Sequence, residues 1–470
     1  MPDKNYALGF TSQENEVRID ELEIEGKIPN WLEGTLLRTG PAKFEIANEK
    51  IKHWFDGFAM LHNFSFEKGR VSYTNKFLQG SFYRESVGKG KISAMGFATD
   101  PCRSIFRRFN SIFFPKPYDN GNVNITRIAD RFLALTETPL PVEFEPKTLK
   151  TLGVFDFKDG IKGQLTTAHP QYDFKTKESF NYTINFAKSS SYNIYSIAEG
   201  KTKRKLIESI AVKYPAYIHS FAITQNYVIL AEYPYKVNPL NLLFRARPFI
   251  ENFFWKPDDG TRFIVISRKT NHLVGEYKTS AFFAFHHVNS YEESDKIILD
   301  IVSYKDASII KALYLDVLLG KFSEEYSDSQ LMRFSIDLNK KSVDSFPIAE
   351  HSIELPRINY EKFNAKKYKY AYAVGLDRKD FINKLVKIDV ESGKKKIWQK
   401  KLCYPGEPVF VCCPSAEGED DGVILSVVLD AKNRKSFLLV LDAKTFNEIG
   451  KAILPHHIPF GFHGNYYSGF

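Results

Sequence analysis

The chain has 470 residues, of which 43% are hydrophobic, and its formal net charge is +9 at pH 7. Its 40 Phe and 25 Tyr residues can build a large core, and they suit β-structure or an apolar binding tunnel. Lys and Arg are scattered, and no basic helix or zinc-finger spacing appears, so no nucleic acid partner is expected. A solvated basic surface accounts for the charge, and attraction to anionic lipid is the functional alternative.

No segment indicates secretion or a membrane span. Residues 1–5 are polar and lack the apolar stretch of a signal peptide. No apolar run reaches the roughly 18 residues that cross a bilayer. The four cysteines are Cys102, Cys403, Cys412 and Cys413, and they form no CxxC pair or disulfide framework, which fits a reducing compartment. We expect a cytoplasmic protein that is not secreted and is soluble or attached to one membrane face.

Short runs of β-branched and aromatic residues dominate the chain. The clearest predicted strands are 70–74, 132–136, 227–231, 263–266, 296–302, 422–428 and 436–441. Several are followed by Asp or Asn with Gly or Lys, which is typical of turns. Repeated short strands predict a sandwich, a barrel or a propeller. No sequence repeat is visible, so self-similarity does not select the propeller.

Three other segments break this pattern. Residues 102–116 and 238–256 mix Leu, Ile, Phe and Trp with Arg and Lys. Such apolar inserts suit insertion into one leaflet of a membrane or, equally, an amphipathic helix packed on the core. Residues 308–319 have the best helical pattern and end at Gly320, a plausible C-cap, so they predict one helix in a cap over the β-domain. Cys102 lies in the first insert, as a plain thiol or an acylation site.

Adjacent histidines, His286 and His287, follow the apolar run 282–285. A histidine at the end of such a strand is either a core residue or a metal ligand. Neighbouring side chains in a strand point to opposite faces, so only one of the two can face a given centre. His169, His219 and His463 have similar settings, but none shows zinc-finger or HExxH spacing. A metal site made from them must be assembled by the fold.

Six motifs in order resemble the carotenoid cleavage oxygenase family, which includes a retinoid isomerase of the retinal pigment epithelium. They span nearly the whole chain: 29–41, 53–62, Ala-His-Pro at 168–170, His-Ser-Phe at 219–221, Phe-His-His-x-Asn-x-Tyr-Glu at 285–292 and Gly-Phe-His-Gly at 461–464. The resemblance implies one all-β domain over residues 1–470. This domain is expected to be a seven-bladed β-propeller with a helical and loop cap over its iron-bearing face.

The resemblance also implies a metal site. One Fe(2+) per chain would be held on the axis by four histidines, namely His169, His219, His286 and His463. Asn289 lies three residues after His286 and selects it over His287. Three carboxylates would accept hydrogen bonds from ligand histidines: Glu137 from His219, Glu354 from His286, and Glu407 from His463. Such partners fix the tautomer of each imidazole and raise its basicity.

Spacing offers a partly independent check. Residues 169, 219, 286, 354, 407 and 463 are separated by 50, 67, 68, 53 and 56 positions. Each step is close to the length of one four-stranded blade with its turns and insertions. Glu137 precedes His169 by only 32 positions, so either its blade is short or it shares a blade with its neighbour.

The function that the resemblance implies is a non-haem Fe(II)-dependent dioxygenase. It would cleave one C=C bond of a carotenoid or apocarotenoid with O2 to give aldehyde or ketone products, with no catalytic side chain separate from the metal site. Four neutral imidazoles suit iron and leave up to two positions open on an octahedral ion. A retinoid isomerohydrolase, a stilbene-cleaving enzyme and a non-catalytic polyene-binding propeller are the alternatives.

The substrate would lie in an apolar tunnel that sets which double bond reaches the iron. Phe55 and Phe58 are candidate tunnel residues, although plain core packing explains them equally well. Val123 and Thr136 fall near positions that line the open side of the metal in the family. Because such a substrate resides in membranes, the two apolar inserts could rest the tunnel mouth on a lipid surface.

Overall fold

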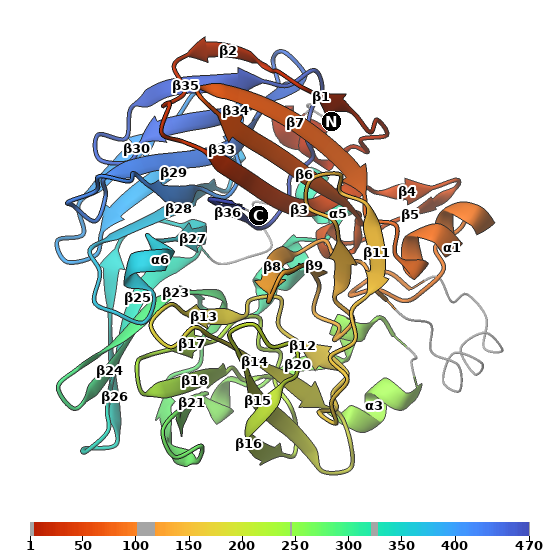
Figure 1. Cartoon of the computed structure of the whole chain (residues 1–470). Coiled ribbons are helices and arrows are strands. Elements are labelled where there is room, and N and C mark those ends of the chain that lie inside the picture. The colour runs from red at the N-terminus through yellow and green to blue at the C-terminus, as the bar shows by residue number, and fades with distance from the viewer. Residues whose placement is uncertain (1–3, 101–117, 245–246, 321–327, 470) are drawn as a thin grey trace.

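The computed structural model describes residues 4–100, 118–244, 247–320 and 328–469. Figure 1 shows antiparallel sheets arranged around a central axis, each with one edge near the axis and the other at the rim. Seven such sheets follow one another along the chain. The fold is a seven-bladed β-propeller, which confirms the prediction.

The first four blades lie in the N-terminal part of the chain. From rim to axis, the first contains β1 (Arg18–Ile19), β7 (Arg70–Phe77), β6 (Phe58–Glu67), β3 (Gly34–Lys43) and β36 (Gly464–Tyr467). The second contains β11 (Thr151–Val154), β10 (Val142–Phe144), β9 (Arg131–Leu135) and β8 (Asn124–Ile128). The third contains β16 (Lys205–Val212), β15 (Ser190–Ala198) and β14 (Glu178–Asn185), with β12 (Leu165–Thr166) and β13 (Gln171–Asp173) paired to β14. The fourth contains β22 (Leu273–Thr279), β21 (Thr261–Ser267), β18 (Tyr227–Glu232) and β17 (Ala222–Ile223).

Three further blades complete the ring. The fifth contains β26 (Ser342–Ala349), β25 (Gln330–Asp337), β24 (Lys296–Tyr304) and β23 (Phe283–Glu293). The sixth contains β30 (Lys395–Trp398), β29 (Phe381–Asp389), β28 (Tyr370–Asp377) and β27 (Ile353–Arg357). The seventh contains β2 (Glu23–Gly26), β35 (Glu448–Ile453), β34 (Lys435–Asp442) and β33 (Gly422–Asp430), with β31 (Cys403–Pro405) and β32 (Val409–Cys412) paired to β33. Two further sheets have two strands each. One pairs β4 (Glu45–Ile46) with β5 (Glu49–Lys50), and the other pairs β19 (Tyr235–Val237) with β20 (Phe253–Trp255).

Both ends of the chain close the ring. The N-terminal strand β2 pairs antiparallel with β35, so an early strand forms the rim of the last blade. The C-terminal strand β36 pairs antiparallel with β3, so the last strand forms the inner edge of the first blade. Strand β36 therefore completes the first blade and strand β2 completes the last blade, so strand pairing between the two ends of the chain closes the ring.

Strands in the middle of each blade are buried on both faces because neighbouring blades pack against each side of the sheet. In β21, Phe263 and Val265 belong to one hydrophobic cluster, whereas Ile264 and Ile266 belong to another. All four side chains are fully buried. Side chains alternate along a strand, so two apolar faces produce a continuous apolar run rather than an alternating one. This explains why a predicted strand such as 263–266 is an uninterrupted run of Phe, Ile and Val.

The prediction of one helix over residues 308–319 is wrong. Two short helices, α4 (Ser308–Ala312) and α5 (Leu315–Leu319), are separated by Leu313 and the extended residue Tyr314. Between the two helices, the backbone bonds to another segment instead of continuing the helix. The carbonyl of Leu313 accepts from Trp54 N at 3.1 Å. Leu315 N donates to the carbonyl of Lys52 at 2.8 Å.

The cap is formed by short elements. The 3-10 helices η1 (Asn5–Phe10) and η2 (Trp54–Asp56) pack with α4 and α5 in the largest hydrophobic cluster. The other helices of the described residues are α1 (Ser81–Lys89), α3 (Pro239–Phe244), η3 (Phe249–Asn252), η4 (Pro257–Asp259) and α6 (Tyr360–Phe363).

The two apolar inserts differ in what can be described. Residues 102–116, with Cys102, lie outside the described residues. Residues 238–256 contain α3, η3 and β20. Ile250 and Phe253 of this insert are 1% and 8% exposed, and they pack in the main core, whereas Leu240 of α3 is 58% exposed. Ile250 and Phe253 of the second insert thus belong to the core, and Leu240 is presented to the surroundings.

Candidate metal centre

Four histidines converge on the axis from four different blades. His169 lies between β12 and β13, His219 just before β17, His286 on β23, and His463 just before β36. One ring nitrogen from each lies within 4.8 Å of the other three. The Nε2 atoms of His169 and His219 are 3.1 Å apart, and those of His286 and His463 are 3.2 Å apart. The fold therefore assembles the four residues that the sequence motifs pointed to.

The backbone of β23 distinguishes its two histidines. Its register on β24 shifts between Ala284 and His287 and again between His287 and Asn289. Such bulges re-aim side chains. His286 turns to the axis, while His287 lies outside the cluster and its Nδ1 is 2.9 Å from Ser220 Oγ. Asn289 fixes the strand beyond them, because its side chain donates to the carbonyls of Phe363 and Lys366 and accepts from Ala365 N.

Three carboxylates accept hydrogen bonds from the outer nitrogens of three of the histidines. The Nδ1 atom of His219 is 2.7 Å from Glu137 Oε1, that of His286 is 2.6 Å from Glu354 Oε2, and that of His463 is 2.7 Å from Glu407 Oε1. An ionised carboxylate only accepts, so each Nδ1 carries the proton. Each Nε2 is then left with a lone pair that faces the axis.

Glu137 reaches the site from an unexpected strand. Blade-length spacing predicts that each blade sends one polar residue to the axis from its inner strand. Glu137 instead follows β9, the second strand from the axis in the second blade. The four strands of that blade lie within residues 124–154, so the blade is short. This answers the question that the 32-residue step left open.

Sequence reasoning missed the groups that hold the carboxylates. Tyr217 donates its phenol to Glu137 Oε1 at 2.8 Å, and Tyr304 donates to Glu354 Oε1 at 2.7 Å. Glu407 Oε2 accepts from Gly464 N at 3.0 Å and faces a guanidinium nitrogen of Arg38 at 3.3 Å. A signal existed for Tyr217, which precedes His219 by two positions and so can share its face in extended chain.

Burial keeps two of the four imidazoles neutral. Burial, and then the neighbouring imidazoles, hold the pKa of His169 and that of His463 well below the ordinary value. Burial opposes ionisation of Glu354, but His286 and the hydrogen bonds of Tyr304 and Leu355 outweigh it, so the pKa of Glu354 is lowered. The neutral imidazoles of His169 and His463 thus lie inside the centre, and the ionised carboxylate of Glu354 lies outside it.

This donor set fits one transition-metal ion. Four nitrogen lone pairs that face one another repel unless a cation or protons lie between them, and the lowered pKa values of His169 and His463 disfavour protons. Imidazole nitrogens suit iron, zinc, copper and nickel. The outer carboxylates supply negative charge one hydrogen bond away from the ion. These residues could therefore hold a divalent metal through four Nε2 atoms.

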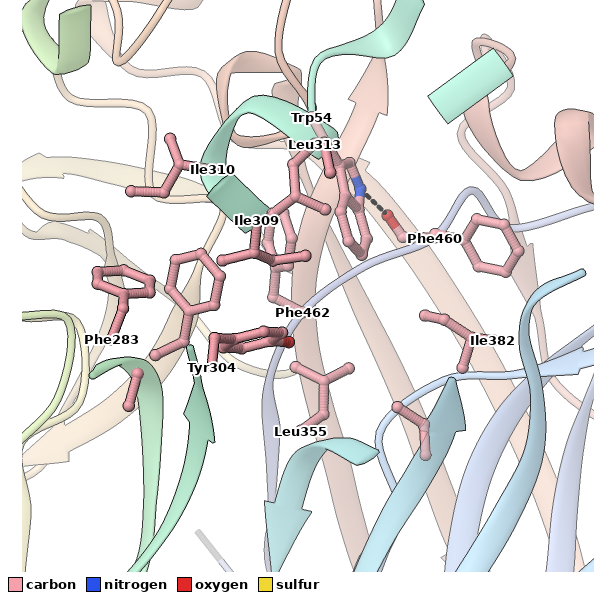
Figure 2. Packing of buried hydrophobic residues seen from close by; sticks show 14 of the residues in the cluster. Trp54, Phe283, Tyr304, Ile309, Ile310, Leu313, Leu355, Ile382, Phe460 and Phe462 are labelled. Carbon is pink, nitrogen blue, oxygen red and sulfur yellow. Dashed lines mark hydrogen bonds between the residues drawn. The ribbon is translucent and has the colours of Figure 1, made fainter. Parts of the chain in front are cut away.

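An apolar cavity of about 60 Å³ adjoins the histidines. His219, His286, His463 and Glu354 contribute to its wall. Figure 2 shows the side chains around this region, with Trp54, Ile309 and Leu313 approaching from the cap and Tyr304, Leu355 and Ile382 from the blades. The other lining residues are Phe55, Val123, Phe285, Leu376, Phe381 and Phe462. A second, polar cavity of about 870 Å³ also reaches His169, His286 and His463.

Two of the four predicted tunnel residues line the apolar cavity and two do not. Phe55 and Val123 are in its wall. Phe58 is absent from the wall, because it lies beyond the turn at Gly57 and its ring stacks on Phe82 of α1 at 4.8 Å. Thr136 is buried but also absent from the wall, since it is the adjacent residue Glu137 that turns to the metal centre. The contact of Phe58 with Phe82 is packing within the core.

Comparisons with known proteins agree with this arrangement. A family model described as retinal pigment epithelial membrane protein matches residues 10–468. The carotenoid-cleaving dioxygenase, mitochondrial, of Mustela putorius furo is 33% identical over 97% of this chain and 95% of its own. The beta,beta-carotene 15,15'-dioxygenase of Gallus gallus is 33% identical over 94% of both chains. A cobalt-substituted Synechocystis apocarotenoid oxygenase superposes with a TM-score of 0.88 and is 30% identical, with 98% of both chains covered.

Proposed function

The chain belongs to the retinal pigment epithelial membrane protein family, and from this premise we propose that it is a non-haem Fe(II)-dependent carotenoid or apocarotenoid cleavage dioxygenase. The observation that carries the proposal is the set of four Nε2 atoms within 4.8 Å, next to an apolar cavity. Relatives at 33% identity are named as carotenoid-cleaving and β,β-carotene dioxygenases. The substrate class for this chain is therefore a long conjugated polyene, and O2 is the co-substrate.

The residues of the centre would hold the metal and keep it reactive. His169, His219, His286 and His463 would bind one Fe(II), and Glu137, Glu354 and Glu407 would keep three of the imidazoles in the correct tautomer. Bound iron supplies the redox chemistry with O2 that cleavage of a C=C bond requires. Neutral ligands leave the ion its full positive charge. That the related apocarotenoid oxygenase has been crystallised in a cobalt-substituted form supports a divalent ion at this position.

The cavity would position the polyene and exclude water. Apart from the three histidines and Glu354, its wall is aromatic and aliphatic, and Phe55 stacks on the imidazole of His219 with a centroid distance of 6.0 Å. A polyene has no polar group near the reacting bond, so its position is set by shape alone. Tyr304 donates its only hydroxyl proton to Glu354, so it offers no acid to the substrate. No side chain is needed as a general acid or base.

Access from a lipid surface is a further part of the proposal. Leu240 on α3 is 58% exposed, and apolar side chains interleaved with cations suit insertion into one leaflet. No helix among the described residues is long and apolar enough to cross a bilayer. Flotation of the protein with liposomes tests the contact: Leu240→Asp should reduce the bound fraction, and absence of the wild-type protein from the lipid fraction would refute it. The cytoplasmic location stays a prediction, and one relative is described as mitochondrial.

One experiment tests the reaction and separates it from its alternatives. Purified protein reconstituted with Fe(II) is incubated with a panel of carotenoids, apocarotenals and a retinyl ester in isotopically labelled O2. A dioxygenase bleaches a polyene and forms a labelled aldehyde or ketone. Isomerised retinol without label would instead identify an isomerohydrolase. Tight polyene binding without any product in the iron-loaded protein would identify a binding protein.

A further inference from the structure

The N-terminal segment 4–10 lies directly behind one wall of the apolar cavity. It contains η1, and its side chains Tyr6 and Phe10 are 1% and 5% exposed. Tyr6 donates its phenol to the carbonyl of Leu318 at 2.8 Å, and Lys4 donates to the carbonyl of Gly320 at 2.8 Å. These bonds fasten the segment to the end of α5 in the cap.

The same segment is fastened to the chain that leads into the metal centre. Phe460 N donates to the carbonyl of Gly9 at 2.8 Å. The Phe460 carbonyl accepts from Trp54 Nε1 at 2.9 Å, and Figure 2 shows this bond beside the cavity. A Cβ atom at Gly9 would lie 2.2 Å from the Phe460 ring, so this close approach needs glycine. The segment is therefore held on two sides.

Phe381 is the cavity residue that the segment supports. It lines the cavity, is 2% exposed, and begins β29. Its ring centroid lies 5.4 Å from that of Tyr6 and 5.4 Å from that of Phe10. Ring contacts also connect Phe381 to the metal centre. The ring centroids of Phe55 and Phe462 are 5.1 Å apart, and those of Phe462 and Trp54 are 4.5 Å apart. The centroid of Trp54 in turn lies 5.8 Å from that of Phe381. Phe381 thus stands between the cavity and the N-terminal segment.

The backbone at Phe381 adopts a conformation that side chains disfavour. Its φ is +55°, in the left-handed region. A bulky residue is found there only where its surroundings impose it. The surroundings here are Tyr6, Phe10, Trp54 and Phe460, whose rings all contact Phe381. Packing therefore fixes a large aromatic side chain in the wall of the cavity.

We propose that Phe381, backed by Tyr6 and Phe10, is the closed end of the cavity and a specificity-determining residue for polyene length. The ring limits how far one end of the polyene extends past the metal centre, and this limit sets which double bond lies at the metal. The role rests on the proposed function, since a wall selects for length only when a polyene occupies the cavity. Because this part of the wall is apolar, the end of the polyene that contacts it should be an apolar group without a polar terminus.

The test compares variants that shorten this wall with a matched control. Phe381→Gly removes a ring about the size of one isoprenoid unit and relieves the left-handed backbone. Phe381→Leu keeps the backbone conformation and shortens the side chain. Tyr6→Ala removes the support and leaves Phe381 in place. Phe446→Gly is the control, because Phe446 has a φ of +68°, is 4% exposed, and does not line the cavity.

The readouts are cleavage of an apocarotenal series that differs by isoprenoid units, and binding of the same series to metal-free protein followed by tryptophan fluorescence. The three wall variants should shift the length preference towards longer substrates by roughly tenfold in relative kcat/KM, or move the cleaved bond along the chain. Phe446→Gly should keep the wild-type preference. Unchanged preference in folded Phe381→Leu and Phe381→Gly would overturn the inference. A wild-type protein that binds the series but cleaves none would instead refute the proposed function, and the binding preference would still test the wall.

Discussion

The Nδ1 atom of His286 lies 2.6 Å from Oε2 of Glu354, although 68 residues separate them in the sequence. His286 lies on the innermost strand of the fifth blade and Glu354 on that of the sixth. The bond therefore joins adjacent blades as well as orienting an imidazole. An equivalent bond between His463 and Glu407 joins the first and seventh blades. The same side chains thus hold the centre and the inner ends of the blades together.

Replacing Glu354 with Gln should weaken metal binding by about 10- to 100-fold. Gln keeps the size of the side chain but removes the charge that raises the basicity of His286. Titration of the metal-free protein with Co(II), followed by its absorption spectrum, gives the Kd of each variant. Glu391→Gln changes an exposed carboxylate on the sixth blade and should leave the Kd unchanged. Equal Kd values for Glu354→Gln and the wild type would contradict this role.

His286→Ala should abolish stoichiometric metal binding, whereas His287→Ala should not. Only His286 belongs to the cluster of converging nitrogens, and His287 points to Ser220. Metal content after reconstitution with Fe(II) and desalting measures the difference. Full metal content in folded His286→Ala, with loss in His287→Ala, would reverse the assignment of the two residues.

Motifs could identify the four histidines because each stands in a short, distinctive stretch of sequence, and blade-like spacing supported them. The position of Glu137 could not be predicted, because its short blade and its strand depend on pairing between segments rather than on residue type. The break between α4 and α5 escaped prediction for a similar reason. Its cause is a pair of backbone bonds to residues 52–54, more than 250 positions away.

Side-chain direction was harder to predict than strand position. Phe55 and Phe58 are three residues apart in one motif, yet one lines the cavity and the other stacks on Phe82. The turn at Gly57 separates them, and composition carries no signal of which way each ring points. The tyrosines and the arginine that hold the carboxylates were missed likewise. Their partners lie on other blades, and only Tyr217 carries a local signal, because it precedes His219 by two positions.

Tyr304→Phe should raise the Kd for Co(II) about tenfold, less than the largest effect expected for Glu354→Gln. The variant keeps the ring in the cavity wall and removes one hydrogen bond to a buried carboxylate, which is worth roughly 1.5–3 kcal/mol at most. Tyr372→Phe is the matched control, because the Tyr372 hydroxyl is buried and has no hydrogen-bond partner among the described residues. If both variants bind the metal as the wild type does, the phenol of Tyr304 does not support Glu354.

Arg38→Met should lower the free energy of unfolding by about 3 kcal/mol. The side chains of Arg38 and Glu407 are 7% and 0% exposed, so loss of the guanidinium leaves a buried carboxylate with less compensation. The cation of Arg357, 3.5 Å from Glu407, compensates for only part of the loss. Arg38 also donates to the carbonyl of Phe462, the residue before the ligand His463, and the variant loses this bond as well.

Urea unfolding followed by circular dichroism measures this change, and two further variants show its origin. Arg127→Met removes a pair whose side chains are 37% and 98% exposed, so it should change stability by less than about 0.5 kcal/mol. The double variant Arg38→Met/Glu407→Gln should recover part of the stability, because it leaves no unpaired buried charge. A double variant less stable than Arg38→Met would mean that Arg38 acts through packing and the Phe462 carbonyl rather than through the charge of Glu407.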